Sequence, residues 1–338
     1  MPVPAADLPR LADRQPQVAP DRLVAELVPP PHFTGVSFAT YRPDPAQPSQ
    51  TAALHALEAF AGRVGRPGAK RGLFRRGKEA AAARGVYLDG GFGVGKTHLL
   101  ASLWHAAPGP KVFGTFVEYT NLVGALGFSG TVEALQGSTL VCIDEFELDD
   151  PGDTVLVSTL LARLAEAGVQ LAATSNTLPE ALGEGRFAAQ DFMREIQGLA
   201  ARFDSVRIDG EDYRHRGVPT APPPLTDEQV AASAAATPGA TLDEFPDLLA
   251  HLSRVHPSRY GALLDGVRTV HLRGVAPVED QSAALRLVVL SDRLYDRDIP
   301  VRASGIPLDQ LFPPALLAGG YRKKYLRTLS RLTALATA

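Results

Sequence analysis

Cysteine is almost absent from this sequence of 338 residues, because Cys142 is the only one. A single cysteine excludes an intramolecular disulfide framework and a metal site built from several thiolates. Cys142 lies in the apolar run 140–143, where we expect a small buried hydrophobic residue rather than a reactive thiol. A chain with no disulfide of its own suits a reducing compartment, so we expect a cytoplasmic protein.

Long apolar runs and an excess of one charge are also missing. No stretch approaches the roughly 20 apolar residues that a membrane-spanning helix needs. The N-terminus has no apolar signal core, and the early acids Asp7 and Asp13 argue against a mitochondrial presequence. Lys and Arg number 34 against 37 Asp and Glu, a formal net charge of −3. The whole molecule therefore gives no electrostatic case for nucleic acid or anionic membrane, which leaves only local patches.

Composition divides the chain into four parts. Residues 1–84 form a proline-rich arm, a helix expected over 51–63 and a basic stretch. Residues 85–216 alternate between strand and helix patterns, and the proline- and alanine-rich residues 217–240 indicate a linker. Residues 241–338 predict a smaller α+β module. The heavy use of Ala, Gly, Arg and Pro suggests a bacterial source.

The central part predicts an α/β fold, a P-loop NTPase core whose parallel sheet is covered by helices on both faces. Helices are expected over 96–106 and 153–167. Strands are expected over 86–88, 112–117, 140–143, 169–173 and 205–208. The C-terminal module shows a helix pattern over 243–255, a short strand over 269–272 and an apolar run over 285–290.

Residues 63–84 are rich in basic side chains and contain a single acid, Glu79. One interpretation is a solvated linker. The other is a patch for an acidic partner such as nucleic acid or anionic lipid. The basic residues are Arg63, Arg66, Lys70, Arg71, Arg75, Arg76, Lys78 and Arg84.

The strongest motif is a glycine-rich loop between a predicted strand and a predicted helix, which satisfies G-x4-G-K-T. Glycines let main-chain N–H groups approach phosphate, and the helix that follows points its positive end at the same anion. Lys96 is expected at the β- and γ-phosphates and Thr97 on Mg²⁺. The expected nucleotide contacts are Gly90, Gly91, Phe92, Gly93, Val94, Gly95, Lys96, Thr97 and His98. A glycine turn that binds nothing is the alternative.

An acidic pair, Asp144 and Glu145, ends the apolar run 140–143. The carboxyl edge of a parallel sheet is where ligands of open α/β folds bind. We expect Asp144 to orient Mg²⁺ and Glu145 to polarise the attacking water as general base. Both acids could instead cap the next helix, since acids favour helix N-termini.

Asn176 ends a third polar motif, Ala-Thr-Ser-Asn over 173–176. A side chain there can lie between the γ-phosphate and the acidic pair, and we predict a catalytic sensor role for Asn176. A turn-forming asparagine is the alternative.

These segments, with others beyond them, resemble the AAA+ ATPases and, among these, the ZapE family of bacterial cell-division ATPases and their mitochondrial relatives. Residues 85–97 resemble the family block G-x-Y-L-x-G-G-x-G-x-G-K-T. Residues 144–150 resemble D-E-F-x-x-x-D, and residues 173–176 its A-T-S-N. Further matches are D-G-x-D-Y-R over 209–214, L-Y-D over 294–296 and R-T-x-S-R-L over 327–332.

The resemblance implies ATP rather than GTP, with Lys96, Thr97, Asp144, Glu145 and Asn176 in the phosphate, magnesium, base and sensor roles. It also implies a homo-oligomer and a protein client, with FtsZ as the candidate.

AAA+ sites are generally completed by an arginine from a neighbouring subunit. Arg186 and Arg194 are both candidates for this role, and Arg286 is a candidate for a second, cis-acting sensor. Two features depart from the family: the compact segment 110–127 and the basic stretch 63–84. A nucleic-acid-associated ATPase of the helicase-loader type therefore remains an alternative, as does a scaffold that binds ATP and barely hydrolyses it.

Overall fold

The chain folds as two compact units, one of which is built from two separate stretches of sequence. The computed structural model describes residues 8–66, 85–91, 93–147, 151–178, 193–210 and 220–337. The larger unit comprises Pro20–His215. The smaller unit combines Met1–Ala19 with Arg216–Ala338.

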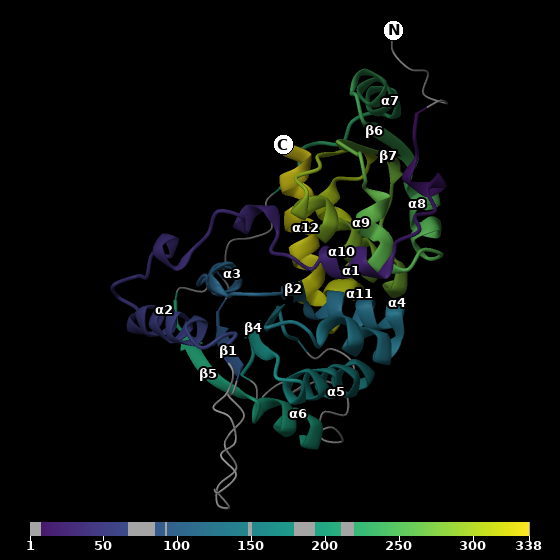
Figure 1. Cartoon of the computed structure of the whole chain (residues 1–338). Coiled ribbons are helices and arrows are strands. Elements are labelled where there is room, and N and C mark those ends of the chain that lie inside the picture. The colour runs from purple at the N-terminus through teal and green to yellow at the C-terminus, as the bar shows by residue number, and fades with distance from the viewer. Residues whose placement is uncertain are drawn as a thin grey trace, which may run out of the picture. The chain divides into compact units, whose positions relative to one another are not determined.

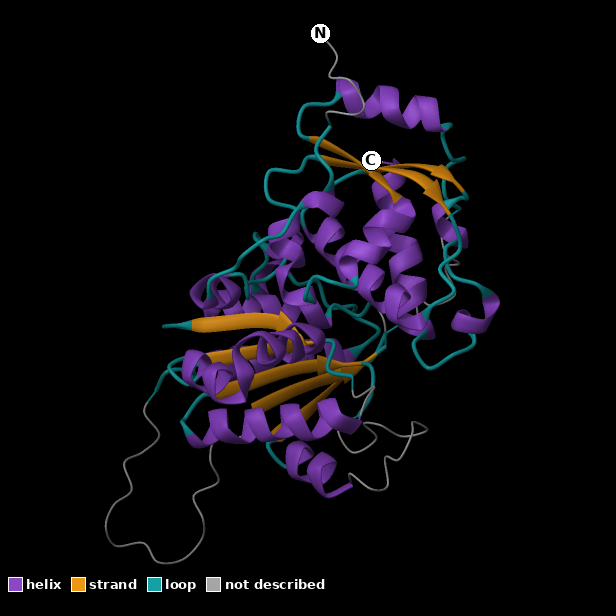
Figure 2. Ribbon diagram, turned by 90° about the vertical axis from the view of Figure 1, so that its right-hand side faces the viewer, coloured by secondary structure: helices purple, strands orange, loops and turns teal. Residues whose placement is uncertain are grey.

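The larger unit contains a five-stranded sheet in the order β2-β3-β4-β1-β5, and every pairing is parallel. Helices pack on both faces of this sheet (Figure 2), so the predicted α/β architecture is confirmed. In chain order its main elements are α1 (Pro20–Ala25), α2 (Pro48–Ala61), β1 (Gly85–Gly90), α3 (Lys96–Ala106), β2 (Lys111–Thr115), α4 (Phe116–Leu135), β3 (Leu140–Asp144), α5 (Pro151–Glu166), β4 (Gln170–Ser175), α6 (Met193–Ala200) and β5 (Phe203–Ile208).

The strand order follows from the direction of the crossovers. Helix α3 leaves β1 on one face, where it packs with α2, and leads to the edge strand β2. Helices α4 and α5 return along the other face, strand by strand, and α6 packs against α5 (Figure 1). Right-handed crossovers require this change of face when the direction of travel reverses. The connections of β1 and β4, which are neighbours, therefore leave on opposite faces, and this is where open α/β sheets bind ligands.

Alternating side chains fill the two faces of the sheet, as period-2 strand geometry requires. Leu88, Cys142 and Ala172 join one buried cluster with α2 and α3. Tyr87 points to the opposite face, where its ring contacts Phe146 with centroids 6.3 Å apart. Cys142 is fully buried, and burial raises the pKa of its thiol well above the usual value.

The second strand ends two residues earlier than the sequence pattern predicts. The expected strand over 112–117 is β2, Lys111–Thr115, because Thr115 begins helix α4. The Thr115 hydroxyl accepts from the Glu118 N–H, and the Glu118 carboxylate accepts from the Thr115 N–H, which is a capping box. The apolar residues that follow Thr115 are therefore helical.

The smaller unit contains a three-stranded parallel sheet in the order β6-β7-β8. Its short 3₁₀ segments include η2 (Leu11–Asp13) and η8 (Pro257–Arg259). Its helices and strands are α7 (Asp227–Ala236), β6 (Ala240–Glu244), α8 (Phe245–Leu252), α9 (Tyr260–Leu263), β7 (Thr269–Val275), α10 (Gln281–Asp296), β8 (Val301–Gly305), α11 (Pro314–Leu317) and α12 (Arg322–Thr337).

The prediction of a linker over 217–240 is wrong for its second half. Residues 227–236 form α7, which Thr226 and Gln229 start with a capping box. Val230 and Ala234 are fully buried in a small cluster with Leu242 of β6. Alanine favours helix, and its small side chain packs closely, so an alanine-rich stretch formed a packed helix here rather than a flexible connection.

The N-terminal segment 8–19 packs within the smaller unit rather than around the P-loop core. The buried carboxylate of Asp243 accepts from the main-chain N–H groups of Leu11 (3.0 Å) and Ala12 (2.9 Å). The Arg14 guanidinium donates to the carbonyls of Leu263 and Asp265. These bonds anchor the segment to β6 and to the end of α9.

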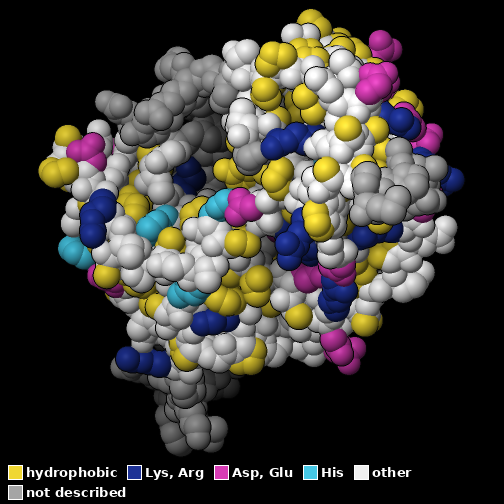
Figure 3. All heavy atoms as spheres, turned by 90° about the horizontal axis from the view of Figure 1, so that it is seen from above, with side chains coloured by type: hydrophobic (Ala, Val, Ile, Leu, Met, Phe, Trp, Pro, Cys, Tyr) yellow, Lys and Arg dark blue, Asp and Glu magenta, His cyan; other side chains and the backbone are white. Residues whose placement is uncertain are grey.

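Surface composition agrees with the charge balance of the sequence. On the face drawn in Figure 3, basic and acidic side chains lie interspersed among hydrophobic and neutral ones. Within the described ranges, none of the helices combines the length and the apolar character that a bilayer crossing requires.

Candidate nucleotide site

The glycine-rich loop lies between β1 and α3, as its sequence context predicts. Gly93 (φ 78°) and Gly95 (φ 88°) adopt the left-handed conformation, which residues with a Cβ atom rarely adopt. Gly95 is the residue immediately before α3, so the free N–H groups of the first helical turn follow the loop directly. Phe92, predicted as a nucleotide contact, lies outside the described residues.

Tyr41 of the proline-rich arm packs against this loop. Its hydroxyl donates to the Val94 carbonyl (2.9 Å), and a Cβ atom on Gly95 would lie 2.6 Å from the Tyr41 ring. Nε2 of His98, the last of the predicted contacts, is 3.0 Å from the Thr40 hydroxyl. The arm therefore fixes the path of the loop, a role that its proline-rich composition did not indicate.

Lys96 is buried and makes three hydrogen bonds. Its Nζ donates to the carbonyls of Gly90 (3.0 Å) and Gly91 (2.6 Å) and to Oδ1 of Asn176 (3.0 Å). An ammonium ion has three donors, so these three oxygens match its capacity.

Burial lowers the pKa of Lys96 to about 8, because a low-dielectric site disfavours the charged form. The carboxylates of Asp144, Glu147 and Asp89 act in the opposite direction and raise this pKa, while Arg207 lowers it further. Lys96 is therefore a cation held against a desolvation penalty by the acids around it.

Asp144 and Thr97 meet at the end of β3, as predicted. The Thr97 hydroxyl lies 3.2 Å and 3.1 Å from the two oxygens of the Asp144 carboxylate. Thr174 of β4 donates a short hydrogen bond to the same carboxylate from the other side. Two oxygen-bearing side chains thus converge next to the glycine loop, and hard oxygen ligands are those that Mg²⁺ prefers.

Glu145 has a left-handed main chain with φ 52°, which is unusual for a residue with a side chain. Its N–H donates to the Thr174 hydroxyl (3.1 Å), and the next N–H, of Phe146, donates to the Thr174 carbonyl (2.7 Å). The Phe146 ring is fully buried against Tyr87 and Phe116. The surroundings thus impose this turn, and strained residues held in this way cluster at functional sites.

Asn176 lies at the end of β4 between Lys96 and Glu147. Its Oδ1 accepts from Lys96, while its N–H and side-chain amide are 3.4 Å and 3.5 Å from the Glu147 carboxylate. The predicted Asn176 is therefore brought directly to the predicted Lys96.

A second charged cluster, formed by Asp89, Arg207 and Asp209, lies beside the loop on the side of β5. The buried carboxylate of Asp89 accepts from Arg207 (2.7 Å), which also contacts Asp209. These hydrogen bonds raise the pKa of Arg207. Gln50 of α2 donates to the Asp209 carbonyl (2.9 Å), and a Cβ atom on Gly210 would lie 2.6 Å from Val94. The D-G pair of the 209–214 motif therefore packs against the loop.

The arginine candidates differ in how much the structure says of them. Arg194 is exposed on α6, and Arg186 lies outside the described residues, as do residues 67–84 of the basic stretch. Arg286 of α10 donates to the carbonyls of Leu252 (3.1 Å), the last residue of α8, and of Val255 (3.4 Å) in the turn that follows. These contacts give Arg286 a packing role within the smaller unit, and its sensor role stays a prediction.

Four side chains at this site were not singled out from the sequence: Tyr41, Asp89, Glu147 and Thr174. Asp89, Glu147 and Thr174 lie inside the motifs over 85–97, 144–150 and 173–176, where their positions beside predicted site residues were a usable signal. Tyr41 becomes visible only when the fold brings its segment to the loop.

Comparisons with known sequences show which protein family this chain matches. The profile of the family described as AFG1-like ATPase matches residues 17–237 and 218–338. The cell division protein ZapE of Escherichia coli K12 is 30% identical over 145 residues, a match that covers 39% of this chain and 39% of that protein. An uncharacterised protein of Schizosaccharomyces pombe is 29% identical over 153 residues, covering 39% of this chain and 33% of its own length. These matches thus span about two fifths or less of the relatives' length.

The solved structures that match this chain are distant in sequence. AMPPCP-bound DnaA of Aquifex aeolicus has a TM-score of 0.39 at 12% identity, covering 52% of this chain and 50% of that one. A putative primosome component of Streptococcus pyogenes has a TM-score of 0.42 at 18% identity, covering 59% of this chain and 100% of that one.

Replacing Gly95 by alanine should lower the thermal stability of the larger unit, whereas Gly91→Ala should change it little. At position 95 the left-handed backbone alone costs roughly 1–2 kcal/mol, and the new methyl group also meets the Tyr41 ring. Position 91 has nothing within 4 Å of a Cβ atom. Thermal unfolding of both variants checks this. Equal melting temperatures for the two would contradict both the backbone strain expected at position 95 and the contact with the Tyr41 ring.

Proposed function

The chain belongs to the AFG1-like ATPase family, and we propose that it binds ATP at residues 90–98 and hydrolyses it to ADP and phosphate. One observation carries the proposal: direct hydrogen bonds join Lys96 to Asn176 and Thr97 to Asp144 at one sheet edge. Lys96 and Thr97 begin α3, Asp144 ends β3, and Asn176 directly follows β4. A glycine turn with only a structural role would not require an acid and an amide from the ends of two other strands.

The loop and Lys96 supply the phosphate contacts. The loop N–H groups and the positive end of α3 favour an anion. The Lys96 donors that now contact Gly90, Gly91 and Asn176 are the groups that would turn to the β- and γ-phosphate oxygens. Burial deprives the ammonium ion of its hydration. Charge-assisted hydrogen bonds to phosphate would compensate for that loss.

Thr97 and Asp144 fit a Mg²⁺ ion. No group of three or more His, Cys, Asp or Glu side chains suited to a metal occurs among the residues that the structure describes. Mg²⁺ is usually bound by one or two protein oxygens together with water and substrate phosphates, so the small donor set is the expected one. When bound, the ion would neutralise charge on the β- and γ-phosphates. Thr174 would hold the Asp144 carboxylate in place through its short hydrogen bond.

Glu145 is proposed as the general base. Its carboxylate takes a proton from water as the water oxygen attacks the γ-phosphorus and the bond from phosphorus to the ADP oxygen breaks. The turn held by Thr174 and Phe146 sets the direction in which Glu145 leaves the strand. Asn176, fixed at Lys96, would orient the water or the γ-phosphate.

A neighbouring subunit is proposed to complete the site with Arg186 or Arg194, as the family resemblance implies. A guanidinium ion would stabilise the charge that develops on the γ-phosphate. We therefore propose a homo-oligomer.

Glu145→Gln should lower steady-state phosphate release from ATP by about 10²–10⁴-fold, because an amide cannot take the proton. Turnover of the unaltered chain should rise more than linearly with protein concentration if the site is shared between subunits. Glu133→Gln, an exposed change on α4, is the matched control and should behave like the unaltered chain. Full activity of Glu145→Gln would refute the proposed base, whereas ATP binding without turnover in the unaltered chain would favour a nucleotide-gated scaffold.

ATP affinity should fall by about tenfold between pH 7 and pH 9, because the fraction of Lys96 that is charged falls by that factor around a pKa of about 8. The sign follows from the lowered pKa, since a neutral amine no longer attracts phosphate. Titration with a fluorescent ATP analogue at both pH values measures the effect. Lys96→Arg, whose guanidinium stays charged, should bind more weakly at pH 7 but lose this pH dependence. A tenfold fall that persists in Lys96→Arg would assign the pH effect to another group.

The client is proposed to be a protein of the division machinery, with FtsZ as the candidate. Support comes from the resemblance of the tail motifs 294–296 and 327–332 and from similarity to a cell division protein. Asp292 of α10 accepts from Arg327 (2.9 Å) and from Arg331 of α12. Both arginines of the R-T-x-S-R-L motif therefore serve the packing of the smaller unit.

Glu145→Gln with ATP should co-sediment with FtsZ polymers more than the same variant with ADP, because blocked hydrolysis preserves the ATP-bound form. Lys96→Ala, which weakens phosphate contacts, is the control and should co-sediment equally with either nucleotide. An FtsZ pellet free of the Glu145→Gln chain in both nucleotides would exclude FtsZ as a direct client.

The helicase-loader alternative was motivated by the compact core and by the basic stretch 63–84, most of which lies outside the described residues. Binding of nucleic acid or anionic lipid there stays a prediction. The cytoplasm is the compartment we propose, on the ground of the single buried cysteine.

A further inference from the structure

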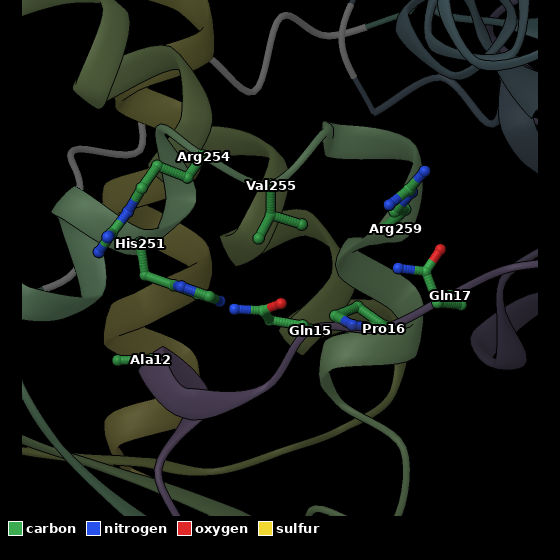
Figure 4. A pocket seen from close by; sticks show the side chains of 8 residues that line it. All are labelled: Ala12, Gln15, Pro16, Gln17, His251, Arg254, Val255 and Arg259. Atoms are coloured by element: carbon green, nitrogen blue, oxygen red, sulfur yellow. The ribbon is translucent and has the colours of Figure 1, made fainter.

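A groove with a volume of about 270 Å³ lies in the smaller unit, between the N-terminal segment and the end of α8 (Figure 4). None of its lining residues belongs to the nucleotide site. They are Ala12, Gln15, Pro16, Gln17, His251, Arg254, Val255 and Arg259. The family match begins at residue 17, so part of one wall precedes the sequence shared with the family.

The groove carries a cation at each end and no carboxylate among its lining residues. Figure 4 shows Arg254 and Arg259 at opposite ends, with Val255 between them. Nε of Arg254 donates to the Ala250 carbonyl (3.3 Å). The Arg259 guanidinium has no hydrogen-bond or ion-pair partner in the described part of the chain. Next to the groove, burial and then the cations Arg259 and Arg286 lower the pKa of His256, which agrees with a positive local potential.

The N-terminal wall offers an unpaired extended main chain. After η2 the chain becomes extended at Arg14 (φ −83°, ψ 133°), and residues 14–18 form neither helix nor strand. Over the residues that the structure describes, the N–H groups of Gln15 and Gln17 donate no hydrogen bond. His251 fixes the segment by donating from Nε2 to the Arg14 carbonyl (2.8 Å). The free N–H groups of an anchored, extended segment can donate hydrogen bonds to the main chain of an extended peptide beside it.

We propose that this groove binds an extended acidic segment of a protein partner, with a carboxylate at each arginine and an apolar side chain between them, on Pro16 and Val255. Each guanidinium can bind a carboxylate with two hydrogen bonds. Single-stranded nucleic acid fits less well, because its binding grooves combine backbone-tracking cations with aromatic platforms, and no aromatic side chain other than the His251 ring lines the groove. The inference rests on the proposed function only in taking the partner to be a protein.

The test is fluorescence anisotropy without nucleotide, using the full chain and a short labelled peptide with glutamate at both ends and leucine in the middle. Binding should weaken as salt rises. The double variant Arg254→Gln/Arg259→Gln should bind about tenfold more weakly, since it removes two charge pairs and exposed pairs contribute only modestly. The matched control Arg322→Gln/Lys323→Gln removes the same charge from the exposed start of α12 and should bind normally. Gln17→Glu, which places a carboxylate in the groove, should also weaken binding.

Three results would overturn the proposal. One is equal affinity of the double variant and the unaltered chain while both keep the same melting temperature. The second is an equal loss in the α12 control, which would show a general charge effect. The third is tighter binding of oligo-dT than of the peptide, lost in the Arg254/Arg259 variant, which would make the groove a nucleic-acid site. Because no nucleotide is present, none of these results bears on the ATPase proposal.

Discussion

Parallel pairing of β4 with both β1 and β3 holds the glycine loop, the acidic pair and Asn176 at one edge of the sheet. The pairing sets Asp89 beside Ser175 and Ile143 beside Ala173, so the residues that follow emerge together. A slip of one residue would turn every side chain of β4 to the opposite face. Thr174 would then lose Asp144 and the Glu145 turn together. The chemistry proposed for the site thus depends on a register that the buried faces of the sheet enforce.

Lys96 shows how this arrangement stabilises a charge that burial disfavours. Burying an ammonium ion costs free energy unless opposite charges and acceptors surround it. Here two loop carbonyls and the side-chain oxygen of Asn176 accept hydrogen bonds from the ammonium group. Three carboxylates raise the pKa of Lys96 and so oppose the fall that burial causes. A phosphate chain would offer the same cation a stronger partner, so the site is poised to exchange internal bonds for ligand bonds.

The sequence was sufficient to predict the parallel α/β core, because glycine, strand and acid signals recur there with regular spacing. Local pattern was also enough to place Lys96, Thr97, Asp144 and Asn176 at one sheet edge. It could not reveal that Tyr41 packs against the loop at Gly95, or that Asp89 pairs with Arg207, since these contacts join segments far apart in the chain. Nor could composition show that residues 227–236 form a helix, because burial of Val230 and Ala234 depends on strands that come later.

The two sequence stretches that form the smaller unit are synthesised at different times, with the larger unit between them. Leu11 bonds to Asp243, 232 residues further along the chain, and the whole larger unit lies between them. On the ribosome the segment 8–19 emerges before the larger unit, yet its partners emerge after that unit. Loop closure over such a distance adds little to the equilibrium cost, since that cost grows only with the logarithm of length. Kinetically it imposes a sequence of events, because domains fold as their residues become available. The smaller unit is therefore expected to complete its fold after the larger unit.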